Sequence, residues 1–284
     1  MSAADNVTSP DPARLDPPVS SARIVYDFAG TTVGFKADDP VWEEWLDGRF
    51  APFRADRAPS WVIELSLGAP TPDFLESPLE VHNEAIAVTP SGGGFRLESE
   101  TFSARVSPAE RAVELEGPMA TYPVDAVLRH LLPLFVDDGL VVHAAMLSVG
   151  DMAWILSGPP ECGKTTLTEL LPDLAACDEL AAVRRVRGEW WAMALPFWRA
   201  RPARGRLRSL FLLAHGEEHR RVGIGAGRAA RALASQVLWP TARAQAMGRA
   251  FNVLADLSAA VPVWRLEFAL RPDVVELILD EDLA

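Results

Sequence analysis

A short segment near the middle of the chain has glycines, a lysine and a threonine at the spacing that binds phosphate. It matches the pattern G-x-x-x-x-G-K-[ST]. Glycines allow a tight turn in which backbone N–H groups point toward phosphate oxygens. The lysine reaches the β and γ phosphates, and the threonine hydroxyl can bind the magnesium ion that bridges them. We therefore expect ATP and Mg²⁺ to bind here. The predicted nucleotide-binding residues are Gly158, Pro159, Pro160, Glu161, Cys162, Gly163, Lys164, Thr165 and Thr166.

The lysine of this segment is unusual for the chain, which has 27 basic residues but only two lysines, Lys36 and Lys164. A compact ammonium on a flexible stem reaches phosphates where a planar guanidinium fits less well. The alternative is a simple glycine-containing turn before a helix. The flanks favour phosphate binding, because residues 153–157 form an apolar run of strand length and residues 164–171 have helical spacing, ended by Pro172.

Two acidic residues follow the predicted helix at short range. Residues 174–177 predict a small strand that ends at Asp178 and Glu179, and Asp178 comes fourteen residues after Lys164. A two-turn helix and a direct return strand would bring Asp178 back beside the phosphates. There it could bind the metal together with Thr165, or accept a proton from an attacking hydroxyl. The alternative is a pair of solvated acids at a surface strand end.

His143 is the third candidate for chemistry. It comes twenty-one residues before Lys164, on a predicted strand that a short turn joins to the strand entering the glycine segment. A lone histidine among apolar neighbours is usually a core residue, so the residues alone leave its role open.

Together these residues resemble the HPr kinase/phosphorylase family, and are more closely similar to the HPr-kinase-related proteins found beside ribosomal-peptide biosynthesis genes. In that family a histidine stands at this distance before the loop lysine, and an acidic pair closes the loop-helix-strand unit. The resemblance covers residues 140–284. It implies an α/β fold with an HPr kinase/PEP-carboxykinase-like P-loop core and a mixed sheet. It also implies catalytic roles for His143, Lys164, Asp178 and Glu179.

The chain departs from that family in two respects. Glu179 stands where HPr kinase/phosphorylases have aspartate, so the base and metal roles of the acidic pair stay interchangeable. No counterpart of the family's downstream glutamate-bearing segment is present, which leaves a phosphorylase activity open. The leading hypothesis is a kinase acting on a serine hydroxyl of a small protein or peptide, such as a ribosomal natural-product precursor. The alternatives are a non-catalytic ATP-binding scaffold of a peptide-modifying complex and a small-molecule kinase.

Composition limits the remaining classes. The 284 residues carry a net charge of −12, which disfavours nucleic-acid binding. The two cysteines show no metal-ligand spacing, and no apolar stretch approaches the ~20 residues that span a bilayer. We expect a cytoplasmic protein that does not bind membranes, and a homo-oligomer by analogy with the HPr enzymes. Five arginines crowd residues 199–208, predicted to form either a solvated loop or a mobile arm that binds phosphate or an acidic peptide.

Hydrophobic periodicity predicts three parts: a disordered tail (1–21), a β-rich region (22–120) and the kinase core (121–284). In the β-rich region we expect a hairpin, a short helix after Asp39, a strand at 61–67 and a meander over 84–115. In the core we expect a helix at 124–135, strands at 140–148 and 153–157, and a hairpin at 181–195. Strands at 207–214 and 220–224 are expected to pair with each other. Helices at 226–239 and 241–259, a strand at 261–268 and a closing helix complete the prediction.

Overall fold

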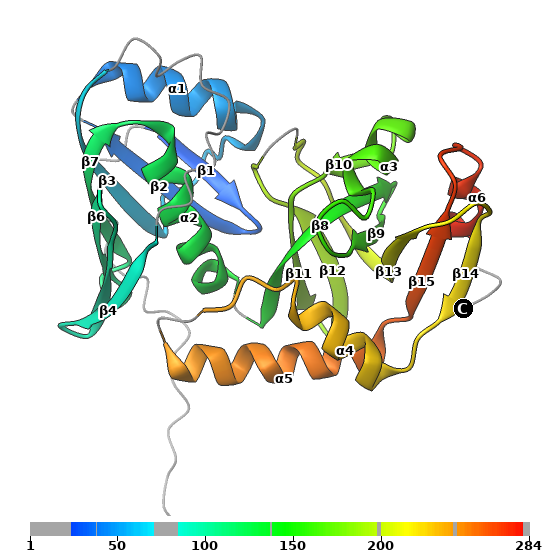
Figure 1. The fold of residues 1–284 in the computed structure, drawn as a ribbon. Helices are drawn as coiled ribbons and strands as arrows, with labels where there is room; N and C mark the ends of the chain where they lie inside the picture. The colour runs from blue at the N-terminus through cyan, green and yellow to red at the C-terminus, as the bar shows by residue number, and fades with distance from the viewer. Residues whose placement is uncertain are drawn as a thin grey trace, which may run out of the picture.

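The computed structural model describes residues 24–37, 39–70, 85–136, 138–197, 200–240 and 243–280. The predicted tail, residues 1–21, lies outside these ranges. The chain forms a mixed α/β structure with two mixed sheets that lie side by side (Figure 1).

The first sheet has seven strands in the order β1-β2-β3-β7-β6-β5-β4. The pairs β2–β3 and β3–β7 are parallel and the other neighbours are antiparallel. The predicted hairpin and meander are therefore confirmed. The strands are β1 (Ile24–Phe28), β2 (Thr31–Ala37), β3 (Trp61–Pro70), β4 (Ala87–Ser91), β5 (Gly94–Glu98), β6 (Ser103–Ser107) and β7 (Ala112–Met119).

The parallel pair β2–β3 needs a crossover, and α1 (Pro40–Phe50) with the 3₁₀ turn η1 (Ala51–Phe53) provides it. Asp39 caps α1, because its Oδ1 accepts a hydrogen bond of 2.9 Å from the N–H of Val41, and Pro40 occupies the first helical position. The buried face of α1, with Trp42, Leu46 and Phe50, packs onto the sheet.

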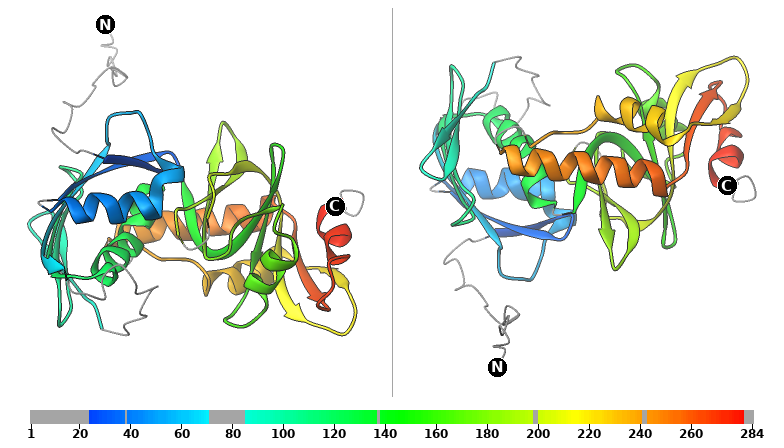
Figure 2. Two further views of the ribbon diagram at one scale, coloured as in Figure 1. Left: turned by 90° about the horizontal axis from the view of Figure 1, so that it is seen from above. Right: turned by 90° about the horizontal axis from the view of Figure 1, so that it is seen from below.

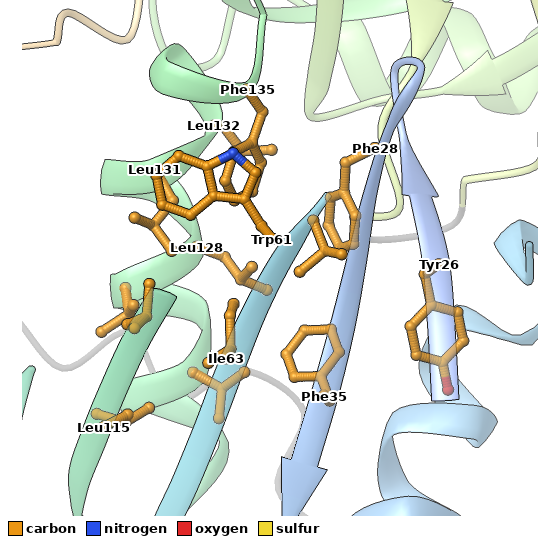
Figure 3. Close-up of a cluster of buried hydrophobic side chains, with 14 of the residues drawn as sticks. Tyr26, Phe28, Phe35, Trp61, Ile63, Leu115, Leu128, Leu131, Leu132 and Phe135 are labelled. Carbon is orange, nitrogen blue, oxygen red and sulfur yellow. The ribbon is translucent and has the colours of Figure 1, made fainter. Parts of the chain in front are cut away.

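A second helix, α2 (Thr121–Phe135), packs against the same sheet and leads to the second one. Figure 3 shows the side chains of Leu128, Leu131 and Phe135 next to Trp61 and other aromatic residues of the first three strands. The same buried cluster continues into the second sheet through Val141, Leu180 and Ala182. The buried face of α2 therefore contacts both sheets. The predicted boundary between residues 120 and 121 lies just before this helix.

The second sheet has eight strands, in the order β10-β8-β11-β12-β13-β15-β14, with β9 between β8 and β13. Its strands are β8 (Gly139–Val149), β9 (Met152–Ser157), β10 (Ala175–Cys177), β11 (Leu180–Val186), β12 (Glu189–Ala194), β13 (Arg204–His215), β14 (Arg220–Gly223) and β15 (Val263–Phe268). Its helices are α3 (Lys164–Leu170), α4 (Ala226–Ala234), α5 (Ala244–Ala260) and α6 (Val274–Leu279).

Helices cover both faces of the second sheet. Alternate residues of a strand point to opposite faces. Accordingly Ala144 and Ile155 pack with α4 and α5, whereas Ala145 and Leu156 pack with α3 and α6. The two views of Figure 2 show the long helix α5 along one side of the sheet and α3 on the other. At the centre, β13 runs parallel to both β9 and β15, so these three strands end at the same edge.

Several predictions about the second half are wrong in detail. Strands β13 and β14 do not pair with each other, because β14 pairs antiparallel with β15. The helix predicted over 226–239 ends at Ala234, since the following segment runs extended beside β8. There the N–H of His143 donates to the carbonyl of Gln236 at 2.7 Å, and Val237 forms an isolated bridge with Val142.

The arginine-rich segment is also partly strand, where a loop or a mobile arm was predicted. Arg204, Arg206 and Arg208 lie in β13 at alternate, exposed positions. Arg201 is held against β10, where its Nε donates to the carbonyl of Ala175 at 2.9 Å. Arg199 lies outside the described residues. In the part of the chain that the structure describes, no helix has the length and apolarity needed to cross a membrane.

Candidate active site at the end of strand β9

The glycine segment forms a tight turn between β9 and α3, as predicted. Glu161 and Gly163 both have left-handed backbone angles, with φ of 62° and 99°. A Cβ on Gly163 would lie 2.6 Å from Cζ of Phe268 at the end of β15. Glycine is therefore required at this position for both its conformation and its close approach to a neighbouring strand.

Lys164 begins α3 and turns back into the loop. Its side chain is buried, and its Nζ donates to the carbonyl oxygens of Gly158 at 3.1 Å and Pro159 at 3.5 Å. Cys162 Sγ lies 3.9 Å from the same nitrogen. A buried ammonium needs acceptors, and here only neutral ones surround it. Anionic oxygens would be stronger partners for this charge.

Strand β8 aligns the turn and the acidic pair. On one edge, Ala144 is paired with Ser157, the last residue of β9. On the other edge, the N–H of Ala144 donates a hydrogen bond of 3.0 Å to the carbonyl of Glu179, in the turn between β10 and β11. Residues 157 and 179 therefore lie at the same level on either side of β8. The return strand predicted from the fourteen-residue spacing is confirmed, since β10 pairs with β8.

The two acids have different surroundings. Asp178 is buried, with 7% of its surface exposed, so it is not a solvated strand end. Glu179 forms an ion pair with Arg129 of α2, through Oε1 and Nη2. Its other oxygen, Oε2, is buried and has no hydrogen-bond partner among the described residues.

His143 lies on β8, one residue before Ala144, and is half-buried. Two hydrogen bonds fix its backbone: the N–H donates to the carbonyl of Gln236, and the carbonyl accepts a hydrogen bond of 3.0 Å from Ser157 Oγ. Burial and the nearby Lys164 ammonium lower the pKa of His143, and Glu179 partly opposes them. A lowered pKa favours the neutral imidazole, which can accept as well as donate a hydrogen bond.

These segments enclose a cavity of about 340 Å³, near the lower end of the ~300–1,000 Å³ of typical ligand sites. The cavity brings together predicted residues from β8, the glycine turn and the acidic turn. Three predicted residues, Gly158, Pro159 and Cys162, do not line the cavity. They contact the Lys164 ammonium instead. The lining residues are His143, Pro160, Glu161, Gly163, Lys164, Thr165, Thr166, Asp178, Glu179 and His215.

Two residues of the site were missed by the sequence analysis. His215 is the last residue of β13, and its Nε2 is 2.7 Å from the carbonyl oxygen of Glu161 in the glycine turn. Its position directly after the strand predicted over 207–214 could have indicated it only if that strand had been placed beside β9, and this pairing was not predicted. Arg129 gave no such signal, since it lies on α2, far from the acidic pair in sequence.

Comparisons with known proteins add little. No protein-family model matches the chain, and no curated protein is significantly similar to it. Among solved structures, the chain is similar to the Hpr(Ser) kinase/phosphatase from Coxiella burnetii, with 13% identity and a TM-score of 0.30. The match covers 49% of this chain and 93% of that one. A likeness of this size carries no argument about function, so the roles of the site residues rest on their geometry and chemistry.

Proposed function

We propose that this chain is an ATP- and Mg²⁺-dependent phosphotransferase with an HPr kinase-like P-loop core. It transfers the γ-phosphate to a hydroxyl, that of a serine, on a small protein or peptide. One observation carries the proposal: Lys164 and two threonines of the glycine turn and α3, the two carboxylates of the acidic turn, and His143 of β8 line a single cavity.

In this proposal the glycine turn binds the triphosphate. The Lys164 ammonium exchanges the neutral carbonyls of Gly158 and Pro159 for phosphate oxygens, which form stronger, charge-assisted hydrogen bonds. The left-handed angles of Glu161 and Gly163 turn the backbone so that its N–H groups can face an anion. His215 steadies this turn by the contact of its Nε2 with the carbonyl of Glu161.

The residues present also fit a magnesium ion bound together with a nucleotide. Among the described residues, no three His, Cys, Asp or Glu side chains form a metal-binding group. Mg²⁺ in phosphoryl-transfer sites is commonly held by one or two protein groups, with phosphates and water completing its ligands. Thr165 and Asp178 are the groups we assign to it. When bound, the ion neutralises charge on the transferred phosphate.

The acceptor hydroxyl must lose a proton during transfer. Asp178 and Glu179 are the carboxylates of the acidic turn that line the cavity, and either can accept this proton. The neutral imidazole of His143 would orient the hydroxyl or relay the proton.

The proposed substrate is a small protein or peptide, including a ribosomal natural-product precursor, and this proposal comes from the sequence resemblance. The two cysteines are free thiols, which suits a cytoplasmic protein.

The direct test is incubation with ATP, Mg²⁺ and candidate peptides, followed by mass spectrometry for a phosphate increment on serine. The neighbouring precursor peptide, if the gene lies beside one, is the first candidate. A variant with Asp178→Asn and Glu179→Gln should bind ATP but transfer no phosphate. Bound ATP without phosphate on any peptide of the panel would contradict the proposal.

The second candidate function is an ATP-binding scaffold without transferase activity. The ion pair of Glu179 with Arg129 favours it, because a carboxylate that is paired with a guanidinium is a weaker base. A scaffold should keep its partner function when both carboxylates are neutralised, whereas a kinase should lose turnover. A small-molecule kinase on the same fold would instead consume ATP with a metabolite panel and ignore peptides.

A further inference from the structure

A chain of alternating charges runs from the first sheet's helices into the cavity. Arg49 of α1 donates to Asp125 of α2 at 2.8 Å, from Nη2 to Oδ2. Four residues further along α2, Arg129 forms the ion pair with Glu179. Residues four apart lie on one face of a helix, so Asp125 and Arg129 are neighbours. This series of charged residues thus connects α1 and α2, which pack on the first sheet, to the acidic turn of the second sheet.

The inner members of this chain are withdrawn from water. The Asp125 side chain is 6% exposed and that of Arg49 is 20% exposed. Asp125 Oδ1 is buried and has no hydrogen-bond partner among the described residues. Buried ion pairs are poor sources of stability, since desolvation offsets most of the attraction. An apolar contact between α1 and α2 would hold the helices equally well, so stability alone does not explain why charged residues are buried here.

Arg129 packs on an aromatic ring. Its guanidinium lies over the ring of Phe197, 5.2 Å from the ring centroid, and the carboxylate of Asp125, four residues earlier in α2, attracts its charge. Phe197 is fully buried and belongs to the cluster that joins both sheets. The guanidinium therefore has a defined position at the edge of the acidic turn, and Glu179 Oε1 follows it.

We propose that Arg129 is a positioning residue of the reaction: it holds the Glu179 carboxylate, so that Asp178 alone acts at the phosphates, and Asp125, itself paired with Arg49, attracts the Arg129 charge from one helical turn away. This inference rests on the proposed function and deepens it, because it assigns different roles to two adjacent acids. It also gives the first sheet a part in the site. Freed from Arg129, Glu179 would compete with Asp178 for the metal or the acceptor hydroxyl.

The test is a suppression experiment. Arg129→Gln should lower kcat by about tenfold or more, in the range that a small misplacement of a reacting group costs. KM for ATP should change little, because Lys164 and the glycine turn are untouched. Adding Glu179→Gln should restore most of the lost kcat, since the competing carboxylate is gone. Arg184→Gln is the matched control, because Arg184 also bridges the two sheets, by a hydrogen bond to the carbonyl of Ala29.

A measurement without nucleotide accompanies the kinetics. Arg129→Gln should lower Tm, because it leaves the half-buried Glu179 carboxylate unpaired, and the double variant should have a higher Tm than Arg129→Gln. The positioning role would be overturned if the double variant were as slow and as unstable as Arg129→Gln. It would also be overturned if Glu179→Gln lost as much activity as Asp178→Asn. A wild type that binds ATP but transfers no phosphate contradicts the proposed function, and the positioning role falls with it. An active wild type whose Arg129 variant is not suppressed contradicts the positioning role alone.

Discussion

The N–H of Ala144 donates a hydrogen bond of 3.0 Å to the carbonyl of Glu179, and through this bond strand β8 holds the acidic turn level with the glycine turn. Ala144 is also paired with Ser157, which immediately precedes the glycine turn. One small, fully buried residue thus sets the relative height of the two halves of the site. A backbone bond of this kind survives side-chain substitution, so single variants of the site residues should report on chemistry rather than on the fold.

Loss of the loop lysine should strongly weaken nucleotide binding. Lys164→Ala removes a buried ammonium whose charge-assisted hydrogen bonds are worth about 1.5–3 kcal/mol each. We expect the Kd for a fluorescent ATP analogue to rise ~100-fold, which corresponds to about 3 kcal/mol. The chain provides its own control, because its other lysine, Lys36, pairs with Glu64 in the first sheet. Lys36→Ala should leave the Kd unchanged, and an equal effect of both changes would argue against a specific site.

Neutralising the buried acid should separate binding from turnover. Asp178→Asn keeps the shape of the side chain but removes its basicity, and general-base catalysis is typically worth ~10²–10⁴ in rate. We expect kcat to fall by about that factor while equilibrium dialysis still detects bound ATP. Asp173→Asn changes the exposed acid five residues earlier and should have no effect on either quantity. Equal turnover of the Asp178 and Asp173 variants would remove Asp178 from the reaction.

A methyl group on the last loop glycine should distort the turn. Gly163→Ala places a Cβ at a φ of 99° and 2.6 Å from the ring of Phe268. Gly188, in the β11–β12 turn, has a φ of 87° but nothing within 4 Å of its added Cβ. Gly188→Ala should therefore cost only the backbone strain, about 1 kcal/mol in urea unfolding, and Gly163→Ala clearly more. Only the Gly163 variant should weaken ATP binding.

The buried Asp125 should make stability depend on pH. Burial raises the pKa of Asp125 to about 6, although Arg49 and Arg129 lower it. The unfolded carboxyl titrates near 4, so between about pH 4 and 6 the folded protein binds more protons than the unfolded chain. The contribution of Asp125 to the free energy of unfolding therefore decreases as pH rises through this window, by roughly 3 kcal/mol in total.

Denaturation of the wild type and of Asp125→Asn at several pH values checks this sign. The amide does not titrate, so the difference in unfolding free energy, wild type minus variant, should fall between pH 4 and 6 and level off above about pH 7. A difference that rises with pH would mean that the guanidinium groups dominate and that the pKa of Asp125 is lowered in the folded protein.

Much of the local structure could be predicted from short-range patterns. The strand, glycine turn and helix around Lys164 follow from an apolar run, two glycines and regular leucine spacing, and the structure has them at the predicted residues. The β11–β12 hairpin follows from Arg187 and Gly188, both of which take left-handed angles. The pairing of β14 with β15 could not be predicted, because strand partners far apart in sequence depend on the packing of the whole sheet.

The sequence by itself predicted the groups proposed to do chemistry: the glycine turn, its lysine and threonine, and the acidic pair. Each is encoded within a few residues, by conformational freedom, charge and spacing, whereas the upstream histidine became a candidate only through the family resemblance. Only the tertiary structure decided how the two acids differ. Asp178 is buried at the cavity, and Glu179 is bound to Arg129. That difference depends on α2, which packs between the sheets because its apolar face is buried against both, a long-range contact that no local pattern encodes.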